Sequence, residues 1–159
     1  MKRTYIFFLC LFLMALTEIS AQTIPVNKRF GKVSREELEL SSYDLDTAAT
    51  ALILYENKWT AIHLNAAGAF TQTTRTHMRI KILKEEGVSW GDFEMICHHS
   101  TKNQESVAGI DVVTYNLVDG KIVETKMPKK YIFTEDFTEN YKKVTFSAQD
   151  VRVGSVIEV

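Results

Sequence analysis

The run Cys97-His98-His99 places a thiol beside two imidazoles, groups that serve nucleophilic catalysis and zinc binding. In a strand, Cys97 and His99 would point to one face and His98 to the other. Two ligands on one face can begin a zinc site, which His77 or His63 would have to complete. Zinc ligands usually stand around a turn, so we interpret the run as a half-buried thiol with two surface histidines. We therefore predict no metal and no other cofactor.

The Cys97 thiol is the one candidate nucleophile with histidines close in sequence. A catalytic cysteine is usually activated at a helix N-terminus or beside a cation. Cys97 instead follows Met95 and Ile96 in a stretch typical of a strand. We expect a small side chain that faces the core, and no catalytic residue.

Adjacent carboxylates and scattered aromatic residues are the other groups that could do chemistry. A glycosidase needs two carboxylates facing each other across a cleft, whereas sequence neighbours such as Glu36 and Glu37 are usually solvated. A sugar-binding face is the functional interpretation of the aromatic residues, and a place in the core is the structural one, which we favour. The aromatic residues concerned are Trp59, Trp90, Tyr115, Tyr131, Phe133 and Tyr141.

One short helix precedes a series of strands. Ser34 and Glu37 have capping-box spacing, and Val33 and Leu38 flank them as a hydrophobic staple, so we predict a helix from Arg35 to about residue 42. Turn signals then separate short apolar runs, which favours an antiparallel arrangement over βαβ units. We predict an all-β fold, an antiparallel β-sandwich with one short N-terminal helix and about eight strands. The candidate strands are residues 51–55, 59–64, 71–83, 93–99, 110–117 and 121–126, with three more candidates at residues 131–133, 143–146 and 151–159.

Residues 71–83 have the clearest strand pattern. Met78, Ile80 and Ile82 alternate with His77, Arg79 and Lys81. A period of two predicts one buried face and one face in water.

Residues 1–21 have the layout of a secretory signal peptide, and residues 22–159 form the single predicted domain. Lys2 and Arg3 precede an apolar run over residues 5–16, which is shorter than the roughly 20 residues of a membrane span. We predict cleavage after Ala21, export to the periplasm or beyond, and no membrane attachment afterwards; an uncleaved anchor is the alternative. Only Cys97 would remain, so no intrachain disulfide is expected.

Charge and composition exclude several classes of protein. The 19 Lys and Arg balance 20 Asp and Glu, and 45% of residues are apolar, as in ordinary globular domains. The nearest basic cluster, Lys126, Lys129 and Lys130, is diluted by acids, so we expect no nucleic-acid partner. Val159 lies within an alternating apolar run, from which we predict a domain incomplete at its C-terminus with an unpaired strand edge.

Four segments carry a resemblance to a known family: residues 30–38 (FGKVSREEL), 79–87 (RIKILKEEG), 115–126 (YNLVDGKIVETK) and 151–158 (VRVGSVIE). They resemble the family known as domain of unknown function 3857, an exported bacterial β-sandwich at the N-terminus of transglutaminase-like proteins. The resemblance implies an accessory role beside a papain-like Cys-His-Asp core, which in the family follows this domain. Cys97 has neither the helix start nor the aromatic neighbour of that nucleophile, so no catalytic residue is carried over.

Two functions remain open. The first is a non-catalytic domain that packs on, or presents substrate to, a downstream or separate transglutaminase-like domain. The second is a free-standing secreted module that binds glycan or peptide through exposed aromatic side chains. An enzyme in its own right would need an activity that alkylation of Cys97 abolishes.

Overall fold

The computed structural model describes residues 25–101 and 104–159. The predicted signal peptide and its cleavage site after Ala21 lie outside these residues. Within them, no helix is long and apolar enough to cross a membrane.

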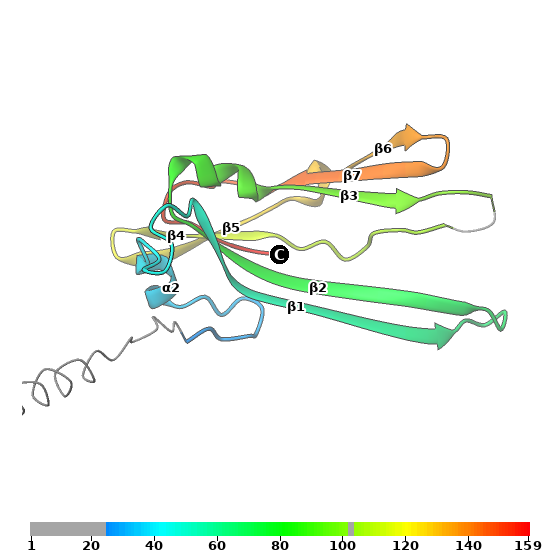
Figure 1. Ribbon diagram of the computed structural model, residues 1–159, viewed down its shortest axis with the longest axis horizontal. Coiled ribbons are helices and arrows are strands. Elements are labelled where there is room, and N and C mark those ends of the chain that lie inside the picture. Colours follow the sequence, from blue (N-terminus) through cyan, green and yellow to red (C-terminus); the bar gives the residue numbers. More distant parts are fainter. Residues whose placement is uncertain (1–24, 102–103) are drawn as a thin grey trace, which may run out of the picture.

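Eight strands form two antiparallel sheets in the described residues (Figure 1). The larger, sheet A, has the order β1-β2-β8-β4-β5, and the smaller, sheet B, has the order β3-β7-β6. The predicted all-β, sandwich-like fold with one short helix is confirmed. Sheet A contains β1 (Ala51–Leu64), β2 (Phe70–Ile82), β8 (Val156–Glu158), β4 (Val113–Val118) and β5 (Lys121–Lys126), and sheet B contains β3 (Asp92–His98), β7 (Tyr141–Ser147) and β6 (Phe133–Thr138).

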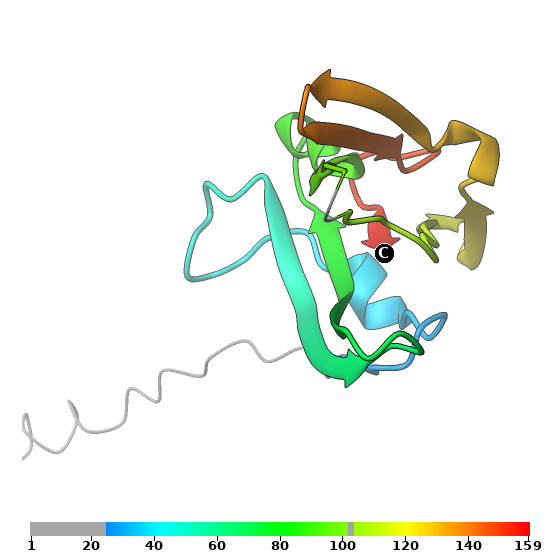
Figure 2. The same ribbon diagram turned by 90° about the vertical axis from the view of Figure 1, so that its right-hand side faces the viewer.

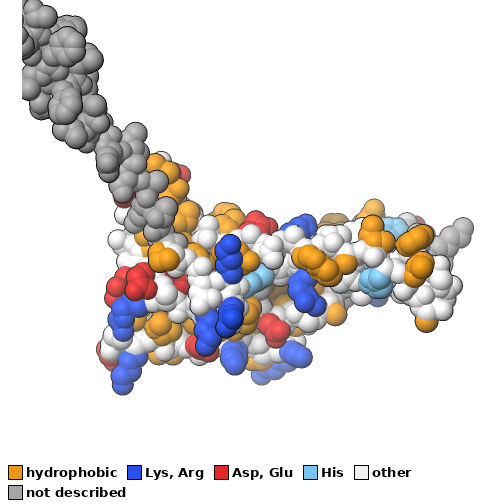
Figure 3. Space-filling model, turned by 90° about the horizontal axis from the view of Figure 1, so that it is seen from below, with side chains coloured by type: hydrophobic (Ala, Val, Ile, Leu, Met, Phe, Trp, Pro, Cys, Tyr) orange, Lys and Arg blue, Asp and Glu red, His pale blue; other side chains and the backbone are white. Residues whose placement is uncertain are grey.

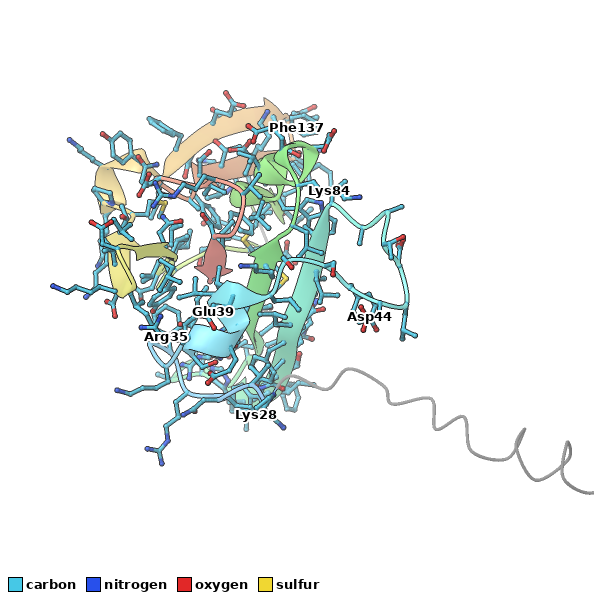
Figure 4. All side chains as sticks on the ribbon, turned by 90° about the vertical axis from the view of Figure 1, so that its left-hand side faces the viewer. Lys28, Arg35, Glu39, Asp44, Lys84 and Phe137 are labelled. Atoms are coloured by element: carbon cyan, nitrogen blue, oxygen red, sulfur yellow. The ribbon has the colours of Figure 1, made fainter. Side chains whose placement is uncertain are left out.

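The helix α2 (Arg35–Glu39) begins where the sequence predicts. Ser34 accepts a hydrogen bond from the Glu37 amide, and the Glu37 carboxylate accepts one from the Ser34 amide at 2.5 Å. The helix ends at Glu39, three residues before the predicted end, because the Leu40 backbone leaves the helical region, with ψ at 119°. Figure 4 shows α2 against sheet A, with Arg35 directed toward the β4–β5 side, where its guanidinium donates to the Gly120 carbonyl.

Apolar side chains fill both faces of sheet A. The face toward sheet B packs Ile80, Ile82 and Ile157 against Val144 and Phe146 of β7. The opposite face packs Val113, Tyr115 and Val156 against Leu38 of α2. The end-on view of Figure 2 shows the resulting order of helix, sheet A and sheet B.

The β1–β2 hairpin is longer than predicted. The expected turn at Asn57 and Lys58 is wrong, because β1 pairs with β2 without interruption to Leu64, with one bulge between Ile53 and Tyr55. The chain turns only after Asn65, whose side-chain oxygen accepts hydrogen bonds from the amides of residues 67 and 69. The far half of this hairpin projects beyond the rest of sheet A (Figure 1).

The β4–β5 hairpin turns where predicted, at Asp119 and Gly120. Both residues have positive φ, 48° and 71°, which a two-residue turn of this kind requires. The 3₁₀ segments Glu85–Gly91 and Lys129–Tyr131 connect sheet A to sheet B, from β2 to β3 and from β5 to β6 respectively.

The strand predicted over residues 151–159 is much shorter. Only Val156–Glu158 is extended, because Gly154 at φ 89° forms a turn in which the Ser155 amide donates to the Arg152 carbonyl. Val153 is exposed and does not share the buried face of Ile157. The strand also does not lie at a sheet edge, since β8 pairs with β2 on one side and β4 on the other.

Candidate functional site

The charged side chains of β2 are buried, contrary to the prediction of a face in water. Arg79 and Lys81 have no exposed surface, because α2 and the segment before it cover this face of sheet A. A buried charge needs a partner or several hydrogen bonds. These residues therefore mark the polar site of the domain.

Arg79 joins two buried carboxylates. Its Nη1 donates to Glu37 Oε1 at 2.8 Å, and its Nη2 donates to Glu158 Oε1. Its Nη2 also lies 3.2 Å from the carbonyl oxygen of Arg29. Glu37, Arg79 and Glu158 are here called the buried charge cluster.

Glu158 is held by four donors from different parts of the chain. Besides Arg79, the Gly31 amide donates to Oε2 at 2.8 Å and the Tyr115 hydroxyl donates to the same oxygen at 3.1 Å. His77 Nε2 lies 2.9 Å from Oε1. The carboxylate therefore fixes the N-terminal segment and β4 onto β2.

Hydrogen bonding sets the charge state of Glu158. Burial alone would raise the pKa of this carboxyl, but the bonds from Arg79, Gly31 and His77 outweigh it and lower the pKa. Burial likewise opposes the charge on Arg79, and its two carboxylate partners raise the Arg79 pKa. The stabilisation from Glu158 is thus present above its ordinary pKa and is lost as the pH falls through the lowered value.

Lys81 lies on the same face without a carboxylate partner. Its ammonium donates to the Leu38 carbonyl at 2.6 Å and to the Gly154 carbonyl. Burial lowers the pKa of Lys81 to about 8. Its position ties the end of α2 to the turn before β8.

Raising the pH from 7 to about 9.5 is expected to increase the free energy of unfolding by about 2 kcal/mol. In this range the unfolded chain keeps a proton on Lys81 that the folded chain has lost, so stability rises with pH. Above about pH 10 the trend should reverse, because burial raises the pKa of Tyr115 and folding then opposes its ionisation.

Urea unfolding of Lys81→Met and of the exposed control Lys58→Met tests whether Lys81 causes this rise in the free energy of unfolding. The first variant should lose it and the second should keep it. A rise that persists in Lys81→Met would show that another group causes it.

The predicted metal and thiol candidates lie on different faces. Cys97 is buried between the two sheets, whereas His77 faces the α2 side of sheet A and contacts Glu158. His99 follows β3 and forms a bridge with Gln104, and His63 pairs with Thr71 in the hairpin. Among residues 25–101 and 104–159, no group of three or more His, Cys, Asp or Glu could hold a metal ion.

The aromatic residues are mostly outside the core, contrary to the interpretation we favoured. Tyr115 alone of the six is buried, and Trp59 on β1 is 54% exposed. Phe70, which the sequence did not single out, is 78% exposed near the tip of the same hairpin. Figure 3 shows hydrophobic side chains at the surface toward this end of the molecule.

One sequence signal for the buried charge cluster was missed, because the alternating pattern was interpreted as one buried face and one face in water. Glu158 interrupts an otherwise apolar run, and a lone acid in such a strand needs a cation nearby. Fold and site together define a two-sheet β-domain with a buried charge cluster. The chain matches no known protein-family model, no curated protein and no solved structure.

Proposed function

We propose that this chain is a non-catalytic accessory β-domain of an exported transglutaminase-like protein. It packs on, or presents substrate to, a Cys-His-Asp catalytic domain of the papain-like superfamily. The resemblance to domain of unknown function 3857 provides the class of partner.

One observation supports this proposal most. The four segments that carry the resemblance meet at the buried charge cluster: they contain Gly31 and Glu37, Arg79, Tyr115, and Glu158, respectively. Each of the four segments therefore contributes at least one side chain or amide to the same hydrogen-bonded cluster.

The position of Cys97 supports a non-catalytic role. Its side chain is 6% exposed and packs in the core with Ile80 and Val144. A nucleophile of the papain-like type must reach its substrate and a histidine base.

The exported chain alone is expected to have no transamidation or peptide-hydrolysis activity. Incorporation of a primary amine into a glutamine-bearing protein should be the same for the chain and for Cys97→Ser. Mixed with a transglutaminase-like domain encoded beside it, the chain should form a stable complex by sedimentation. Activity of the chain alone that Cys97→Ser abolishes, or absence of any complex, would overturn the proposal.

A free-standing glycan- or peptide-binding module is the second candidate, and the exposure of Trp59 favours it. Ligand stacking on this indole would change tryptophan fluorescence. A saturable change in tryptophan fluorescence on addition of oligosaccharides, absent in Trp59→Ala, would support this second function.

A further inference from the structure

Strand β2 has an open edge over its first eight residues. On the side away from β1, it pairs with β8 through Arg79–Lys81, flanked by reciprocal backbone bonds of 2.9 Å between Met78 and Val159. Residues 70–77 continue along the same edge with no neighbouring strand in the part of the chain that the structure describes. An edge of this kind is a template for another strand.

The ladder determines which backbone groups face the open edge. Met78, Ile80 and Ile82 bond toward the β8 side. Because bonding direction alternates along an antiparallel strand, residues 72, 74 and 76 direct their N–H and C=O groups the same way. These groups set the register of an added strand.

The projecting ribbon, residues 56–64 and 70–77, lacks the support that a two-stranded ribbon needs. An isolated hairpin is marginal in water, and a third strand or a covering layer stabilises it. Ile62, Leu64 and Phe70 share the ribbon face that continues from Ile80, and all three are more than 60% exposed. An added strand would supply the missing neighbour.

The charges along this edge favour an acidic strand. Arg75 is the one Lys, Arg, Asp or Glu among residues 70–77, and no ion pair among the described residues involves it. At the same edge, β8 already places Glu158 opposite Arg79. Arg75 lies four residues along on the same face of β2, so an acid opposite it would repeat that pairing.

We propose that residues 70–77 of β2 bind an extended peptide segment of the partner polypeptide, antiparallel to β2 and in line with β8, with a carboxylate opposite Arg75. This inference rests on the proposed function, since it takes the segment from the catalytic domain. Pairing of two copies through the same edge is disfavoured because it would bring the two copies of Arg75 near each other.

The octapeptide TVEVTVTV, acetylated and amidated, is the probe. In the proposed register its glutamate lies opposite Arg75 and its valines lie on the ribbon face of Phe70. Binding to the exported chain should slow amide hydrogen exchange at residues 72, 74 and 76. N-methylation of the fourth peptide residue should abolish binding, whereas N-methylation of the fifth should not, because that N–H points away from β2.

Two sets of variants test the edge and the charge separately. Thr74→Pro should block binding, whereas Thr74→Val, which also removes the hydroxyl bonded to Thr60, should not. Arg75→Glu should lower the affinity for the peptide on the order of fivefold, and lysine in place of the peptide glutamate should restore the affinity.

Unchanged amide exchange, equal binding of both methylated peptides, or a dimer that Thr74→Pro dissociates would overturn this inference. The peptide assay uses the chain alone. If the peptide does not bind, sedimentation with the catalytic domain still tests the proposed function separately. Loss of that complex with retained peptide binding would instead reject the proposed partner.

Discussion

Replacing Arg79 by methionine is expected to lower the free energy of unfolding by about 3–5 kcal/mol. The variant would leave Glu37 and Glu158 without their common cation inside the protein, where neither carboxylate has exposed surface. A loss of this size approaches the whole stability of a marginal domain, so urea midpoints measured near pH 7 should fall steeply.

Arg75→Met is the matched control, because Arg75 lies on the same strand and the same face but is exposed. It should change stability by no more than about 0.5 kcal/mol. Adding Glu37→Gln and Glu158→Gln to Arg79→Met should recover part of the loss, since no carboxylate of the cluster is then buried without its cation. Equal effects of the two arginine variants would contradict the role assigned to the buried charge cluster.

Replacing Gly87 by alanine is expected to destabilise the domain by about 2–4 kcal/mol. A Cβ at this position would stand 2.1 Å from the carbonyl oxygen of Thr50. That oxygen accepts hydrogen bonds from the Leu83 and Lys84 amides at 2.9 and 3.0 Å, which join the start of β1 to the end of β2. The backbone would have to move and these bonds would weaken.

Gly91→Ala is the control, since Gly91 lies in the same 3₁₀ segment. Its added Cβ would meet only side-chain atoms, the nearest being Val151 Cγ2 at 3.0 Å, and these can yield. Thermal unfolding of this variant should show a free energy of unfolding within about 1 kcal/mol of that of the parent. A Gly87→Ala domain as stable as Gly91→Ala would mean that Thr50 moves at little cost.

Local sequence signals predicted the local structure. The capping box at Ser34 and Glu37 gave the start of α2, and Asp119-Gly120 gave the β4–β5 turn. Each of these features depends on residues within a few positions of one another. The all-β class followed from the spacing of the turn signals.

Contacts between segments far apart in the chain could not be predicted from the sequence. Alternation shows that Arg79 and Ile80 point to opposite faces, but it does not show that α2 covers the Arg79 face. Glu37 and Glu158 come from segments 42 and 79 residues away from Arg79, so the cluster exists only once sheet A is assembled. The Asn57 turn failed for the same reason, because pairing with β2 overrides a local turn preference.

We propose that this domain serves a transglutaminase-like catalytic domain. Mass spectrometry of the native protein, immunoprecipitated from the exported fraction with an antibody against residues 25–101, tests it most directly. We predict peptides of a Cys-His-Asp catalytic domain in the precipitate, either within the same polypeptide or in equal amount with it. Recovery of peptides from this β-domain alone would contradict the claim.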